Sequence, residues 1–233
     1  MTAREMQIEM ERRIQLIDPT LILDNKVTSD TLFSFLNAYT KRYVKQIYLL
    51  ADNINDGTRA QKNSIDSIKS LITRDTLEET NKTNSDANTK SFILPDDYFL
   101  YIRSNSIVTS TYRDASLTTP QTIPNELIEV EDASNIITTP YNQIILRNPQ
   151  VIMHTQDNDT CLHVIHDKFT TITQVDLVYY RLPKEFNVNN VDGTNIIDHC
   201  ELPESMHMEI VEGAVEMFIT ENKYRLNVKQ DKQ

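Results

Sequence analysis

The chain has 233 residues and a formal net charge of −11, from 23 Lys and Arg against 34 Asp and Glu. This length corresponds to one or two domains and is long enough to bury a core of useful size. Glycine is scarce: the three glycines are Gly57, Gly193 and Gly213, where average usage of about 7% would give ~16. Phosphate-binding loops and dinucleotide-binding turns need several glycines close together, so the sequence excludes both.

The acidic balance also argues against a protein that grips nucleic acid, because such proteins carry clustered Lys and Arg. The one basic cluster, Lys41, Arg42 and Lys45, has the spacing of one helix face. No stretch of 18 apolar residues occurs, and the first ten residues lack the apolar run of a signal peptide. We therefore expect no membrane association, and we expect Cys161 and Cys200 to be reduced thiols.

Residues 1–80 are predicted to be helical. A first helix over Ala3–Ile17 has apolar residues at helical spacing and ends before Pro19, since the residue preceding a proline is disfavoured in a helix. Thr28 or Ser29 can cap a second helix that runs to about residue 54. A turn at Asn55-Asp56-Gly57 and a third helix from Thr58 would complete an antiparallel helical hairpin. The buried face of that third helix would carry Ile65, Ile68, Ile72 and Thr76.

The second helix is apolar over a wider arc than one contact surface requires. The residues along that arc are Leu32, Phe33, Leu36, Tyr39, Tyr43, Ile47 and Leu50. An oligomer of helices would bury the excess, so Leu36, Tyr43 and Ile47 are candidate residues of an interface between subunits.

Residues 81–91 are polar and are predicted to form a linker or exposed loop. Residues 92–200 are rich in Thr, Ile, Val and Tyr, which favours a small antiparallel sheet or barrel. The candidate strands are Tyr98–Thr111, Leu127–Glu131, Gln143–Leu146, Val151–Thr155, Cys161–His166 and Thr173–Arg181. Prolines fall between these strands, where a missing N–H does no harm.

A final helix is predicted over residues 201–222, with Pro203 in its first turn and a stripe through Met206, Ile210, Gly213, Ala214 and Met217. Residues 223–233 are expected to be a polar tail, unstructured in the isolated subunit. The tail holds Lys223, Arg225, Lys229 and Lys232 against Asp231 alone, which suits docking to an acidic partner surface. Its candidate interface residues are Tyr224, Arg225, Leu226 and Lys229. The fold class is α+β.

The best candidates for metal ligands are His154, Cys161, His163 and His166, followed later by His199 and Cys200. Cys161 and His163 alternate on a predicted strand and share a face, whereas His166 has the opposite parity. Tetrahedral zinc needs four convergent ligands, so we expect no metal. No nucleophile motif or distinctive carboxylate pair occurs, and we expect neither a cofactor nor catalysis.

Segments at both ends of the chain resemble head–tail connector ring proteins of crAss-like bacteriophages. At the start, these segments are Thr2–Met6, Val27–Thr31, Leu36-Asn37 and Arg42–Val44. At the end, they are Tyr179–Pro183, Cys200–Glu204, His207, Glu209–Val211 and Ala214-Val215. The middle of the chain is poorly matched.

The resemblance implies a non-enzymatic virion protein, made in the host bacterial cytoplasm, that forms a portal-adaptor ring in the phage neck. Such a ring would match the twelvefold symmetry of the portal, contact the portal and an adjacent neck or tail ring protein, and continue the DNA channel without binding DNA. Family adaptors use a terminal segment to grip the portal, which the resemblance extends to Tyr224–Gln233. The alternatives are a minor capsid or decoration protein and a metal-dependent phage hydrolase.

Overall fold

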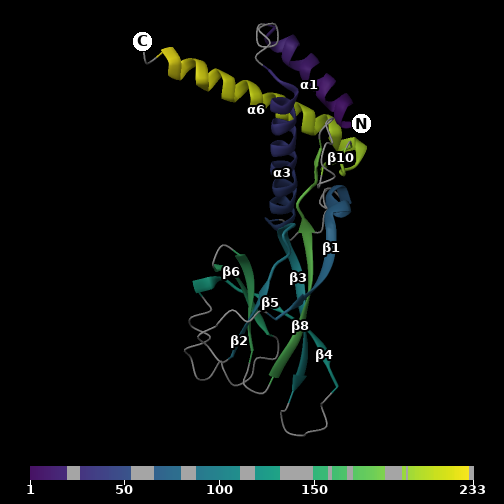
Figure 1. Cartoon of the computed structure of the whole chain (residues 1–233), viewed down its shortest axis with the longest axis vertical. Coiled ribbons are helices and arrows are strands. Elements are labelled where there is room, and N and C mark those ends of the chain that lie inside the picture. The colour runs from purple at the N-terminus through teal and green to yellow at the C-terminus, as the bar shows by residue number, and fades with distance from the viewer. Residues whose placement is uncertain are drawn as a thin grey trace. The chain divides into compact units, whose positions relative to one another are not determined.

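The computed structural model describes residues 1–19, 27–53, 66–79, 88–110, 119–131, 149–156, 159–166, 170–186, 196–197 and 199–230. The chain divides into two compact units. One, the helical unit, joins Met1–Leu71 to Leu182–Gln233, and the other, the sheet unit, spans Ile72–Arg181 (Figure 1). Helices and strands are both abundant, which confirms the α+β class.

Local sequence determines where α1 (Ala3–Ile17) begins and ends. The Thr2 hydroxyl accepts from the Glu5 backbone N–H at 3.2 Å, and the Thr2 N–H donates to the Glu5 carboxylate at 2.8 Å. This capping box satisfies two backbone donors that the first turn would otherwise leave unpaired. The buried residues of α1 are Ala3, Met6, Met10 and Ile14, and the helical spacing of the sequence predicted the last three. Ile17 follows Met6, Met10 and Ile14 at the same helical spacing and was expected on the same face, but it is exposed.

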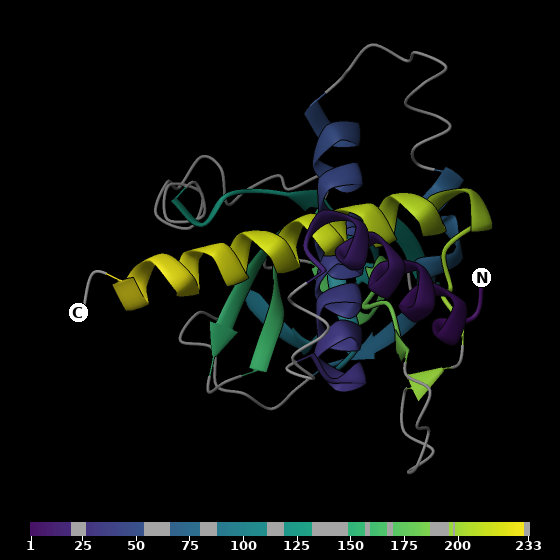
Figure 2. The same cartoon turned by 90° about the horizontal axis from the view of Figure 1, so that it is seen from above.

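The second predicted helix is α3 (Ser29–Asn53), and the Thr28 hydroxyl accepts from the Thr31 N–H at its start. It packs against α6 (Glu204–Gln230), which begins directly after Pro203. The inward residues of α6 are His207, Ile210, Val211, Gly213, Ala214, Val215 and Phe218. Figure 2 shows α6 lying across α3, and α1 contacts both of these helices. A short parallel pair, β9 (Glu185–Phe186) and β10 (Ile196–Ile197), also belongs to the helical unit.

The C-terminal helix is longer than predicted. The sequence suggested an end at residue 222 followed by an unstructured tail, but α6 continues to Gln230. The physical reason is that Lys, Arg, Leu and Gln extend an established helix at little cost, since the expensive step is nucleation. The prediction of an unstructured tail is therefore wrong for residues 223–230.

The predicted third helix is also wrong over its second half. Ile68 is buried in a short helical segment that ends in η1 (Lys69–Leu71), and β1 then covers Ile72–Glu78. Ile72 and Thr76 thus lie on a strand, paired with Tyr180 and Asp176 of β8. The first part of this predicted helix and the turn at Gly57 lie outside the described residues.

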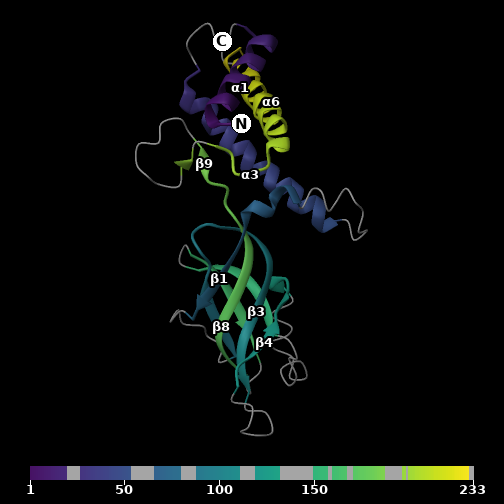
Figure 3. The ribbon, with the colours of Figure 1, turned by 90° about the vertical axis from the view of Figure 1, so that its right-hand side faces the viewer.

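The sheet unit contains two four-stranded sheets that share one core (Figure 3). The first has the order β1-β8-β3-β4, where β8 is Thr170–Arg181, β3 is Tyr98–Ser110 and β4 is Gln121–Pro124, and all its pairings are antiparallel. The second has the order β2-β7-β6-β5, where β2 is Thr89–Ile93, β7 is Asp159–Ile165, β6 is Gln150–Gln156 and β5 is Glu126–Leu127. The β5–β6 pairing is parallel. Both sheets contribute apolar side chains to the core, among them Phe92, Leu162, Val175 and Tyr179.

Four predicted strands are confirmed, as β3, β6, β7 and β8, with each bound within three residues of its expected position. The strand expected over Leu127–Glu131 is shortened to Glu126–Leu127, and the one over Gln143–Leu146 lies outside the described residues. Part of the predicted linker, Thr89–Ser91, belongs to β2. Ser91 pairs there with His163 in register, so it is a structural residue of the sheet.

Candidate functional site

The predicted interface residues on α3 lie inside the helical unit. Leu36 is 0% exposed, and Tyr43 and Ile47 are each 6% exposed. The Tyr43 hydroxyl donates to the Glu209 carboxylate at 2.9 Å and lies 2.8 Å from the Met206 sulfur, both on α6. Burial raises the pKa of Tyr43, and the hydrogen bond to Glu209 raises it further. In this structure the apolar arc of α3 is therefore largely covered by the subunit's own helices.

A glycine sets how closely α3 and α6 approach each other. A methyl group at Gly213 of α6 would overlap the aromatic ring and hydroxyl of Tyr39 on α3. That ring stacks on Tyr43, with ring centroids 6.4 Å apart. The missing side chain thus makes room for an aromatic ring at the helix crossing, a function that the sequence did not reveal.

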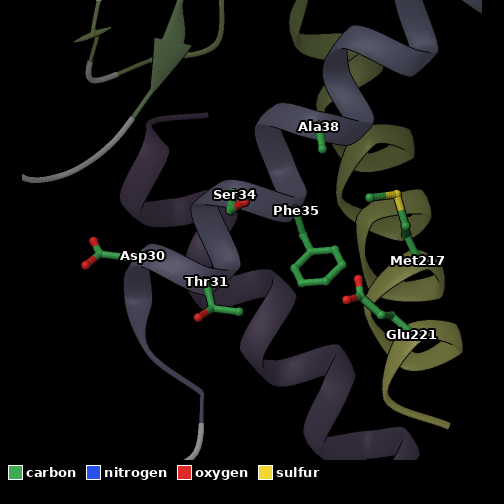
Figure 4. A pocket seen from close by; sticks show the side chains of 7 residues that line it. All are labelled: Asp30, Thr31, Ser34, Phe35, Ala38, Met217 and Glu221. Carbon is green, nitrogen blue, oxygen red and sulfur yellow. The ribbon is translucent and has the colours of Figure 1, made fainter. Parts of the chain in front are cut away.

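Beside this crossing, α3 and α6 leave an open hollow of about 520 Å³, which we call the α3–α6 hollow. Figure 4 shows the Phe35 ring on α3 pointing towards Met217 and the Glu221 carboxylate on α6. The complete lining is Asp30, Thr31, Ser34, Phe35, Ala38, Met217 and Glu221. Phe35 is held in place by an edge-to-face contact with Phe218 at 5.3 Å between centroids. The hollow combines an apolar floor with two acidic residues.

The predicted tail residues Tyr224, Arg225, Leu226 and Lys229 are positions on the last turns of α6. Figures 1 and 2 show these turns extending past α1 and α3. The eight helical residues after Asn222 have a length of about 12 Å at the usual helical rise. Within the helical unit, this end of α6 is thus an extension that neither α1 nor α3 flanks.

The acidic residues predicted on α6 lie on the surface of the helix and do not form a catalytic carboxylate pair. Glu212 is exposed and accepts from Arg13 of α1 at 2.8 Å, while Arg13 also contacts Glu9 at 3.1 Å. Glu204 is exposed as well, and Glu209 accepts from Tyr43. The contacts of Glu212 and Glu209 thus join α1 and α3 to α6.

The sheet unit brings some of the predicted metal ligands together. Cys161 and His163 share a face of β7 as predicted, and both are buried. His163 Nδ1 lies 2.9 Å from the Ser91 hydroxyl, and the rings of His154 and His163 have centroids 5.7 Å apart. Burial lowers the pKa of His163, and the neighbouring His154 lowers it further. Among the described residues, no group of three or more His, Cys, Asp or Glu side chains is placed to hold a metal ion.

His199 and Cys200 do not act as a pair in the helical unit. His199 forms an isolated antiparallel β-bridge with Thr2, and its side chain is exposed, whereas Cys200 is 5% exposed. Burial raises the pKa of the Cys200 thiol, which disfavours the reactive thiolate. Cys161 and Cys200 are both free thiols. Within the ranges that the structure describes, no helix has the length and apolar character needed to cross a bilayer.

The sequence is similar in part to a protein of a bacteriophage. The chain is 28% identical over 141 residues to a protein named Ring protein 4/5 from Bacteroides phage crAss001. The match covers 57% of this chain and 55% of that protein, so the chain spans about half the length of its relative. No family model matches the sequence. This partial similarity directs the functional question towards ring-forming structural proteins of bacteriophages.

Proposed function

We propose that this chain is a virion structural protein that forms an oligomeric ring in the neck of a bacteriophage. The observation that carries the proposal is the similarity over 141 residues to a protein named as a ring protein of phage crAss001. The resemblance in the first 44 residues and in residues 179–215 points to the same class. In this role the ring joins the portal to the tail, matches the portal's twelvefold symmetry and continues the DNA channel.

The surface of the helical unit supports assembly. Large apolar side chains are exposed on α1 and α3, and Leu16 and Leu50 are 78% and 59% exposed. The others on these two helices are Ile8, Ile17 and Leu49. A subunit in a ring must present two different patches, one to each neighbour, and so exposes more apolar surface than a monomer. These residues replace Leu36, Tyr43 and Ile47 as the available apolar surface.

The charge of the chain suits a conduit. A net charge of −11 repels phosphate, and an acidic wall avoids the salt-dependent adhesion that Lys and Arg produce. The proposal therefore places genomic DNA in the channel without specific binding. It assigns a structural role and no catalytic residue to the chain.

Electron microscopy of the purified protein mixed with portal tests the proposal. We expect a ring stacked on the portal, with twelve subunits in class averages, and no such particles when capsid protein replaces portal. Binding to capsid protein by monomers or trimers would instead identify a minor capsid or decoration protein. Stoichiometric zinc that survives dialysis, with a hydrolytic activity removed by chelation, would identify a metal-dependent hydrolase.

A further inference from the structure

We infer that the α3–α6 hollow is the socket for the C-terminal end of α6 from a second copy of this chain. The inference rests on the proposed ring and names the surfaces that join its subunits. The contact is head to tail: each copy offers its own α6 end to one neighbour and its hollow to the other. It assigns the last turns of α6 to the neighbouring subunit rather than to the portal.

The chemistry of the hollow defines what fits it. Phe35 and Met217 are only half-buried, so the floor presents apolar surface that an incoming side chain can cover. Asp30 is exposed on α3, and Glu221 lies on the α6 side. An occupant of matching chemistry is a short helical segment that carries both apolar and basic residues.

The last turns of α6 have that composition. Residues 223–230 read Lys-Tyr-Arg-Leu-Asn-Val-Lys-Gln, with three basic and no acidic residues on a chain of net charge −11. In a helix, positions 224 and 228 share one face, and positions 225 and 229 share the next. The segment therefore offers apolar and basic positions side by side, as the floor and rim of the hollow require.

The geometry makes the contact intermolecular. Met217 and Glu221, which line the hollow, belong to the same continuous helix as residues 223–230. A continuous helix cannot bring its own last turns back onto its preceding ones, so these turns can enter only the hollow of another copy. Such a heterologous contact repeats from subunit to subunit and closes into a ring when the rotation allows.

Mixed single-cysteine variants, made in a background in which Cys161 and Cys200 are both replaced by Ser, test the inference. Ala38→Cys places a thiol on the exposed rim of the hollow, and Leu226→Cys places one on the α6 end. Under mild oxidation, we expect a disulfide-linked dimer when the two variants are mixed. Arg12→Cys, at an exposed position on α1, replaces Ala38→Cys in the control mixture and should give no such dimer. Absence of the dimer with Ala38→Cys at any protein concentration overturns the inference.

Two further sets of variants probe the contact without cysteine. Ala38→Phe fills the hollow from an exposed position and should reduce assembly at least tenfold, whereas Gln46→Phe, also exposed on α3, should not. Asp30→Lys and Lys229→Asp should each weaken assembly at low salt, and their combination should restore it. Circular dichroism confirms that each variant is folded. Equal assembly by all of these variants also overturns the inference.

The results separate this inference from the proposed ring. If stacked rings form, but Ala38→Phe leaves assembly unchanged and the cysteine variants give no disulfide-linked dimer, the proposed ring is supported and the contact between its subunits lies elsewhere. If Ala38→Cys links to portal rather than to Leu226→Cys, the hollow binds the portal and the inference fails. If the disulfide forms but only open chains are seen, the contact is supported and the closed neck ring is not.

Discussion

The close packing of Gly213 on Tyr39 leads to a prediction whose sign depends on one aromatic ring. Replacing a helical glycine with alanine normally stabilises a protein by about 1 kcal/mol, because glycine loses more backbone freedom on folding. At Gly213, however, the new methyl group would overlap the Tyr39 ring. Forcing such extra volume into a packed contact costs about 1–3 kcal/mol. Gly213→Ala should therefore lower the free energy of unfolding by roughly 0–2 kcal/mol.

A double-mutant cycle isolates the clash. In a Tyr39→Ala background the ring is gone, so Gly213→Ala should now raise the free energy of unfolding by about 1 kcal/mol. The difference between the two backgrounds, about 1–3 kcal/mol, is the coupling between the two residues. Urea denaturation followed by far-ultraviolet circular dichroism measures each term. Thr220→Ala, at an exposed position of α6, serves as the control and should change stability equally in both backgrounds.

The cycle also tests whether the Tyr39 ring is the cause of the clash. If Gly213→Ala has the same effect with and without the Tyr39 ring, that ring does not occupy the space above Gly213. The close approach of α3 to α6 would then have another cause.

Three other predictions concern burial and protonation. Leu36→Ala should lower the free energy of unfolding by about 2–5 kcal/mol, and Leu36→Asp should unfold the helical unit, because Leu36 is fully buried. Leu50→Ala should change the free energy of unfolding by no more than about 0.5 kcal/mol, because Leu50 is exposed. Thermal melts of the three variants measure these differences. Tyr43→Phe should cost about 1–2 kcal/mol through the lost bond to Glu209. Because the folded state raises the pKa of Tyr43, the hydroxyl contributes fully to the free energy of unfolding below about pH 10, and this contribution is lost at higher pH. Tyr43→Phe should therefore lose less stability at alkaline pH than the wild type does. Burial lowers the pKa of His163 and His207 in the folded state. Below about pH 6.5 the unfolded chain therefore binds more protons than the folded chain, and protonation favours unfolding. The urea midpoint should accordingly fall as the pH is lowered from about 7 to about 5. A double replacement by Gln that kept the full wild-type fall would contradict this assignment.

Local signals in the sequence determined where the first helices begin and which strands form. Thr2 with Glu5 and Thr28 with Thr31 make caps within three residues, so α1 and the start of α3 need no distant partner. The long strands β3 and β8 carry enough β-branched and aromatic residues to be recognised alone.

Tertiary contacts decided the rest. Ile72 and Thr76 fit a helical spacing, but β8 lies beside them and pairs with them, although it is about 100 residues further along the chain. The apolar arc of α3 is visible in the sequence, but only the folded unit shows that Leu36 is buried, that Tyr43 lies against α6 and that Leu50 stays exposed. The hollow and the glycine contact arise where α3 crosses α6, and no local pattern encodes a crossing between helices that are about 150 residues apart in the sequence.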